Sequence, residues 1–96
     1  MSPYKKKQLI KLRNELDRLD LSLINIIKKR YNLVKKVLNL KDYRNQIVDK
    51  KRINFILREI KKKSLLKQID PKVTHRIWKN MIYAFIDYEK RNFKKK

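Results

Sequence analysis

Apolar side chains recur at helical spacing through the first forty residues of the chain. No Pro or Gly falls between them, and they stand at Leu9, Leu12, Leu16, Leu19, Leu23, Ile26, Ile27, Val34 and Val37. Steps of three and four residues place such side chains on one face of an α-helix. The pattern therefore predicts a first helix from about Tyr4 to Lys41 with one buried face.

Two shorter helices are predicted after it. The segment from Asp42 to Val48 lacks the helical period and is expected to be a loop. Asp49 can cap a helix from Lys50 to about Lys67, and Asp70 followed by Pro71 marks the start of a third helix, because Pro at the first helical position loses no hydrogen bond. The inward positions are predicted to be Ile53, Ile56, Leu57 and Ile60 in the second helix, and Ile77, Trp78, Met81, Ile82, Phe85 and Phe93 in the third.

The length of the first helix predicts an assembly of two chains. A helix of this length spans about 57 Å at 1.5 Å per residue, whereas a compact domain of the same chain length is roughly 30 Å across. The two shorter helices cannot cover the apolar side chains at the far end of the first helix. We therefore predict an all-α fold of three helices per chain in an intertwined (domain-swapped) homodimer, with one domain over residues 1–96 and basic tails at 1–8 and 94–96.

The charge balance adds a second possibility for function. The chain has 29 Lys and Arg residues against 9 Asp and Glu residues, for a formal net charge of +20. Such a balance favours polyanionic partners, so a non-catalytic basic helical dimer that binds nucleic acid is one alternative. The basic residues are spread along the whole chain, however, and abundant Lys, Ile and Asn are also what an A/T-rich coding sequence produces. We expect any nucleic-acid binding to be incidental to the charge.

Several classes of site are excluded by composition. The chain has no Cys, so it has no disulfide and no thiolate metal site, which fits a reducing, cytoplasmic setting. No apolar run reaches 18 residues, so no membrane span is expected. His75 is the one His and is expected to face solvent, while Trp78 is expected in the core. We expect no metal and no cofactor.

Four cations and one carboxylate interrupt the predicted apolar faces. Arg30 occupies a position of the stripe on the first helix, and Lys41 lies eleven residues further on, about 20° away around the helix. Arg13 lies to one side of that stripe, Arg52 shares the inward edge of the second helix, and Glu89 is on the apolar side of the third. Charged side chains on inward faces are candidates for a functional site.

Two explanations of these charges remain open. Unpaired buried cations cost several kcal/mol each, so they need partners. Internal pairs are one answer, with Arg30 or Lys41 pairing with Glu89, and Arg52 with Asp49. One glutamate cannot neutralise four cations, however, and a small ligand with two carboxylates could, since guanidinium groups bind carboxylates in a paired geometry.

The order and spacing of these residues resemble the all-helical chorismate mutases over residues 12–93. The chain reads LRNELDRLDLSLINIIKKR from Leu12 to Arg30, places Lys41 eleven residues later, continues with DKKR at 49–52 and starts its last helix at a proline. The resemblance implies a homodimer with two active sites that convert chorismate to prephenate, a step of aromatic amino acid biosynthesis. The reaction is an intramolecular pericyclic rearrangement that needs no cofactor.

The resemblance also implies roles for individual residues. Arg30 and Arg52 would hold the substrate carboxylates, with Arg13 arriving from the partner chain, and Lys41 would donate to the ether oxygen of the breaking bond. Asp49 matches the aspartate that the family has at the start of its second helix.

Three positions depart from the family pattern. Ile53 stands where the typical mutase has Glu, Phe85 replaces a small polar residue, and Glu89 stands where many members have Gln. To donate a hydrogen bond to the ether oxygen, Glu89 must be protonated, so we expect higher activity on the acid side of neutral. An apolar residue after the arginine and a short loop after Lys41 also resemble the isochorismate pyruvate lyases, which share this fold and are the alternative enzyme.

Overall fold

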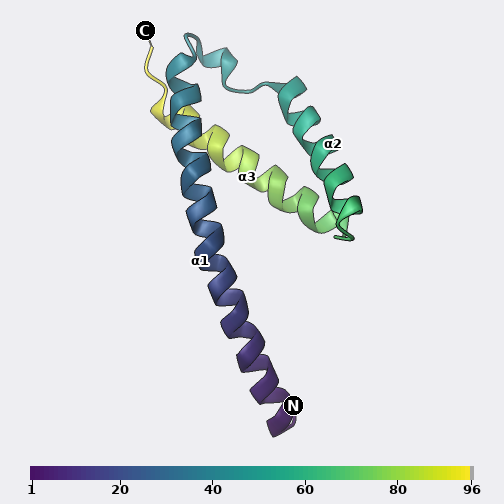
Figure 1. The fold of residues 1–96 in the computed structure, drawn as a ribbon. Coiled ribbons are helices and arrows are strands. Elements are labelled where there is room, and N and C mark those ends of the chain that lie inside the picture. Colours follow the sequence, from purple (N-terminus) through teal and green to yellow (C-terminus); the bar gives the residue numbers. More distant parts are fainter. Residues whose placement is uncertain (96) are drawn as a thin grey trace. The chain divides into compact units, whose positions relative to one another are not determined.

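The computed structural model describes residues 1–95, in which every regular element is a helix. Helix α1 spans Pro3–Leu40, a short 3-10 helix η1 spans Arg44–Gln46, α2 spans Lys50–Leu66 and α3 spans Pro71–Asn92 (Figure 1). The predicted all-α fold with a very long first helix is confirmed. The first two helices end within about one residue of their predicted ends, and the third begins at Pro71 as predicted. The prediction of a loop from Asp42 to Val48 is wrong in one respect, since this segment contains η1.

The chain divides into two compact units, which are described separately: Met1–Leu33 and Val34–Lys96. The first consists of the greater part of α1. The second contains the end of α1, together with η1, α2 and α3. No helix in the described residues is both long enough and apolar enough to span a membrane.

In the N-terminal unit, the apolar stripe of α1 is largely exposed to solvent. The exposed fractions are 55% for Leu12, 57% for Leu16, 65% for Leu19, 52% for Leu23 and 55% for Ile26. The helix was predicted to bury this face, and in the single chain it does not. Residues of α1 outside the stripe add to the exposed apolar surface, namely Ile10, Leu21, Ile24 and Leu33.

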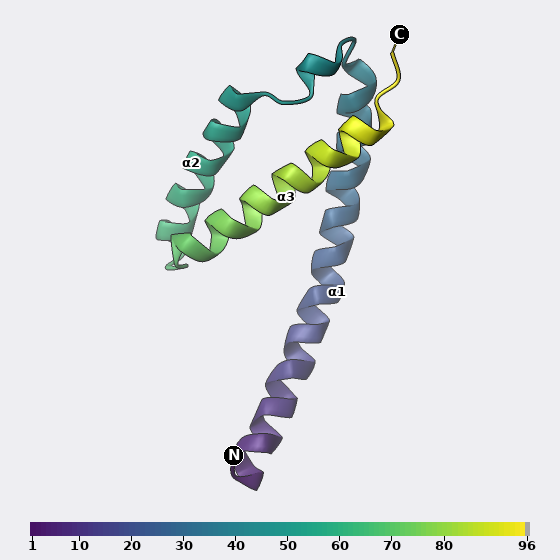
Figure 2. The same cartoon turned by 180° about the vertical axis from the view of Figure 1, so that it is seen from behind.

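In the C-terminal unit, α2 and α3 lie side by side and run in opposite directions (Figures 1 and 2). Their core is a cluster of four buried isoleucines, with partly buried apolar side chains packed around it: Ile47, Ile53, Ile82 and Ile86, surrounded by Val48, Ile56, Leu57 and Phe93. Ile53, Ile56 and Leu57 thus face inward as predicted, and Trp78 is half-buried as part of the same side of α3.

In the C-terminal unit, two apolar positions predicted to face inward are wrong. Ile77 is 53% exposed, because five helical steps place it about 140° from Ile82, while Ile86, one turn after Ile82, is buried instead. Val37 is 46% exposed and the next residue, Leu38, is buried at 8%. In both cases the observed face is rotated relative to the face chosen from sequence.

Both predicted helix caps are present. The Asp49 carboxylate accepts a hydrogen bond from the Arg52 backbone N–H at 3.0 Å, and the Asp70 carboxylate accepts one from the Lys72 backbone N–H at 2.9 Å. Each cap satisfies a backbone donor that has no partner within its own helix. Pro71 follows as the first residue of α3.

The connection between α2 and α3 requires a left-handed residue. Gln68 has φ 58°, the Gln68 N–H donates to the Leu65 carbonyl at 3.2 Å, and the Ile69 N–H donates to the Ser64 carbonyl at 2.9 Å. These bonds form the Schellman motif, in which glycine is the usual left-handed residue. The Ser64 and Thr74 hydroxyls, 2.6 Å apart and buried, join the two helices beside the turn.

Candidate active site

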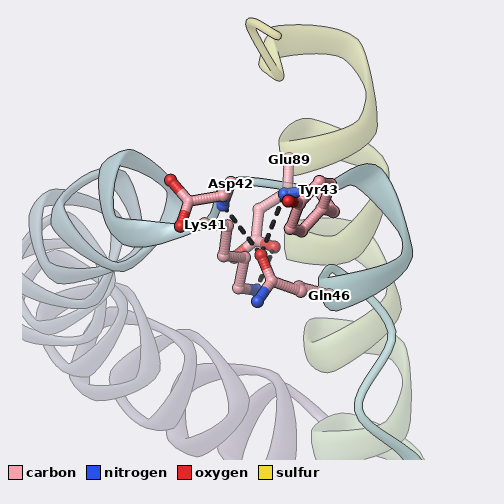
Figure 3. Close-up of polar contacts among 5 residues, drawn as sticks. All are labelled: Lys41, Asp42, Tyr43, Gln46 and Glu89. Atoms are coloured by element: carbon pink, nitrogen blue, oxygen red, sulfur yellow. Dashed lines mark hydrogen bonds and ion pairs between the residues drawn. The ribbon is translucent and has the colours of Figure 1, made fainter. Parts of the chain in front are cut away.

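A lysine and a glutamate from distant parts of the sequence meet inside the C-terminal unit. The Lys41 ammonium donates to the Glu89 carboxylate at 2.7 Å, and the exposed fractions of the two side chains are 18% and 8% (Figure 3). One of the predicted internal pairs, Lys41 with Glu89, is therefore formed. A distance this short is typical of a charge-assisted hydrogen bond.

Helix geometry explains why the two groups meet. Glu89 lies three residues after Ile86 and seven after Ile82, so it continues the buried stripe of α3 at its C-terminal end. Lys41 directly follows the last residue of α1, and its N–H still donates to the Leu38 carbonyl at 3.1 Å. The Lys41 side chain therefore leaves the helix from a defined backbone position and reaches Glu89.

A glutamine holds the chain just after Lys41. The side-chain oxygen of Gln46 accepts hydrogen bonds from the Asp42 N–H at 2.7 Å and the Tyr43 N–H at 2.9 Å (Figure 3). Both donors would otherwise lack a helical partner. Gln46 was not among the residues predicted from sequence. Its one signal was a glutamine three residues after the start of a short turn, which is the spacing of a reciprocal cap.

The predicted site residues of α2 have other local roles. The Asp49 carboxylate caps the helix and contacts the backbone of Arg52, whereas the predicted alternative was an ion pair with the Arg52 side chain. The Arg52 guanidinium lies 5.6 Å from the centre of the Phe55 ring and is exposed. Ile53 is 8% exposed and belongs to the isoleucine core. Phe85 is half-buried on α3, one turn before Glu89.

Arg13 and Arg30 lie in the N-terminal unit. Arg13 is exposed, whereas Arg30 is half-buried. The Nε of Arg30 is buried and has no hydrogen-bond partner within residues 1–95. A buried donor without an acceptor costs about 1–3 kcal/mol, and more when it is charged. Arg30 therefore has an unmet requirement for an acceptor.

Of the predicted site cations, Lys41 is thus paired with a carboxylate, whereas Arg30 has a buried donor without an acceptor within residues 1–95. Lys41 has the Glu89 carboxylate, and its ammonium has two further N–H donors for other acceptors. Arg30 offers a buried donor. Within residues 1–95, no three His, Cys, Asp or Glu side chains gather closely enough to hold a metal ion. Each of these two side chains, Lys41 and Arg30, can offer a ligand hydrogen-bond donors and positive charge.

Comparison with protein-family models gives the class of this chain. The model of chorismate mutase type II matches residues 12–90, which include every predicted site residue. The chain belongs to the chorismate mutase type II family. No curated protein and no solved structure matches the chain significantly.

The burial of the Lys41–Glu89 pair predicts a specific stability effect. Replacing Glu89 by Ala leaves the ammonium in a largely buried position without a counter-charge, so Glu89→Ala should lower the free energy of unfolding by about 2–4 kcal/mol. Replacing both partners by apolar residues, Lys41→Met with Glu89→Leu, should recover most of that loss. The measurement is denaturant unfolding at one fixed protein concentration.

The matched control is Glu59→Ala. Glu59 pairs with Lys62 at 3.7 Å on the surface, where the side chains are 37% and 75% exposed. Its loss should be below about 1 kcal/mol, because exposed ion pairs contribute little. Equal losses of unfolding free energy for Glu89→Ala and Glu59→Ala would show that the Lys41–Glu89 pair contributes no more to stability than an exposed ion pair.

Proposed function

We propose that this protein is a chorismate mutase that rearranges chorismate to prephenate. The observation that carries the proposal is the enclosed Lys41–Glu89 pair, formed within the stretch that matches the family. The reaction is intramolecular and pericyclic, so the protein has to select the folded conformer of the substrate and stabilise its developing charge. The aromatic pathway and a reducing, cytoplasmic setting are part of the same proposal.

Lys41 has the central role in the proposed mechanism. One of its three ammonium N–H donors is directed at Glu89, which fixes the position of the group, and another is available for the ether oxygen of the breaking bond. Negative charge grows on that oxygen in the transition state. A donor held in place before the reaction stabilises this charge without reorganising, which is the more effective form of electrostatic catalysis.

The arginines would bind the two substrate carboxylates. Arg30 is the strongest candidate, because its buried Nε has no acceptor in the single chain. Arg52 is exposed at the start of α2 and free to turn from Phe55 toward a carboxylate. Asp49, Ile53 and Phe85 would complete the lining, with the two apolar side chains making the site drier than in the typical mutase.

A homodimer is the second part of the proposal. Exposed leucines and isoleucines recur along α1, a helix of 38 residues. A second copy of the same helix would cover these side chains with a matching apolar face, and no other kind of chain is needed. In this arrangement Arg13 of one chain completes the site of the other.

Two alternative functions would give different results in the same tests. The apolar Ile53 favours the isochorismate pyruvate lyase reaction, since the typical mutase has Glu at that position. The net charge of +20 favours nucleic-acid binding without catalysis. The assays below give different results for the three functions.

Incubation with chorismate should give prephenate, and incubation with isochorismate should give no pyruvate. Arg30→Ala should reduce kcat/KM by about 10²–10³, the usual effect of removing one preorganised donor to developing or bound charge. Arg18→Ala is the matched control, because Arg18 is an exposed arginine of the same helix. It should leave kcat/KM unchanged.

The same two variants test the nucleic-acid alternative. If DNA binding is a property of net charge, Arg30→Ala and Arg18→Ala should weaken it equally in a gel shift at fixed salt. Pyruvate from isochorismate without prephenate from chorismate would establish the lyase. No product from either substrate would overturn the enzyme proposal.

Mixed dimers test whether Arg13 acts across chains. Arg13→Ala and Arg30→Ala should each be inactive alone. When the two variants are unfolded together and refolded in equal amounts, half of the dimers are mixed and each has one intact site, so activity should return to about a quarter of wild type. Continued inactivity, or sedimentation as a monomer at micromolar concentration, would contradict the shared site.

A further inference from the structure

Arg44 joins the two segments that carry the internal pair. It is the first residue of η1, three residues after Lys41, and its guanidinium donates to the backbone carbonyl of Lys90 at 3.1 Å. Lys90 directly follows Glu89. The same guanidinium lies 5.3 Å from the centre of the Phe93 ring. One side chain therefore contacts both α3 and its C-terminal cap residue.

Both contacts suit an arginine better than any other residue. The Lys90 carbonyl is among the last four of α3, which accept no hydrogen bond from a backbone N–H of the helix. A cation at a helix C-terminus is also favoured by the helix dipole. The planar guanidinium can donate in its plane while its face stacks on an aromatic ring. A lysine ammonium is a point charge without such a face, so it would replace the charge but not both contacts.

The anchor points around Arg44 are themselves fixed. Phe93 packs against the isoleucine core, and Ile47, directly after η1, is 4% exposed within that core. Gln46 accepts from the two N–H groups that follow Lys41. The six residues from Lys41 to Gln46 are thus held at both ends, and Arg44 is the contact that ties their middle to α3.

We infer that Arg44 is a positioning residue, which keeps the Lys41 ammonium on Glu89 by holding the turn after α1 against the C-terminal end of α3. Its consequence for catalysis rests on the proposed function. The positioning itself is a property of the fold and has a readout that does not involve chorismate.

That readout is the acylation of the Lys41 amine by an acetyl ester, followed by mass spectrometry of peptides. In the wild type, Lys41 should react slowly, because it is paired and only 18% exposed. In Arg44→Ala it should react about tenfold faster, since the turn opens locally at lower cost. Arg44→Lys should be intermediate. Lys62, which is 75% exposed, serves as the internal reference for reagent activity.

Arg91→Ala is the matched control. Arg91 is an exposed arginine beside Lys90 in the last turn of α3, so its loss changes the charge and the helix dipole as much as Arg44→Ala does. Lys41 should keep its wild-type protection in this variant. Phe93→Leu removes the stacking face alone and should give a partial increase, which keeps the inference testable if Arg44→Ala does not fold. Unchanged protection of Lys41 in Arg44→Ala and Phe93→Leu, or equal loss in Arg91→Ala, would overturn the inference.

Kinetics separate this inference from the proposed function. With chorismate, Arg44→Ala should lower kcat about tenfold and change KM less than about twofold, because a loosened Lys41 loses an interaction made in the transition state. A wild type that is inactive on chorismate while Arg44→Ala exposes Lys41 would refute the proposed function alone. An active wild type whose Arg44→Ala variant keeps both kcat and the protection of Lys41 would refute the positioning role alone.

Discussion

The ion pair between Lys41 and Glu89 constrains the whole C-terminal unit. Its partners are 48 residues apart in sequence, and removing both charges from water is costly unless they approach closely. Helix α3 must therefore extend its buried stripe past Ile86 to place Glu89, and α1 must end where Lys41 can reach it. The turn after α1 is held by Gln46 and Arg44, so these polar contacts surround the position from which Lys41 reaches Glu89.

Periodicity and caps were enough to predict the helices of this chain from its sequence. The nine apolar positions of α1, and Asp49 and Asp70 before the later helices, are local signals that tertiary context does not override here. The inward position of Glu89 followed from the same period. The choice between Ile77 and Ile86 did not, because an apolar residue at the edge of a helical face can be assigned to either side until the neighbouring helix is known.

The site was less accessible from sequence than the fold, because its contacts are not local. Lys41 and Glu89 were identified as a possible pair, among several pairings that spacing alone could not rank. Arg44 carried no such signal, since a 3-10 turn in a short loop has no period and the Lys90 carbonyl that Arg44 binds is a backbone group. Gln46 carried only the spacing of a cap. The unmet Nε of Arg30 is visible only once burial is known.

Gln68 has a consequence for how this sequence could evolve. The chain contains no glycine, so the one left-handed position within residues 1–95 is occupied by a residue with a Cβ, at a cost of roughly 1–2 kcal/mol. For a domain of this size each kcal/mol corresponds to about 4–8 °C in melting temperature. A change of one codon, from Gln68 to Gly, should therefore raise the melting temperature. No proposed site residue lies at this turn between α2 and α3.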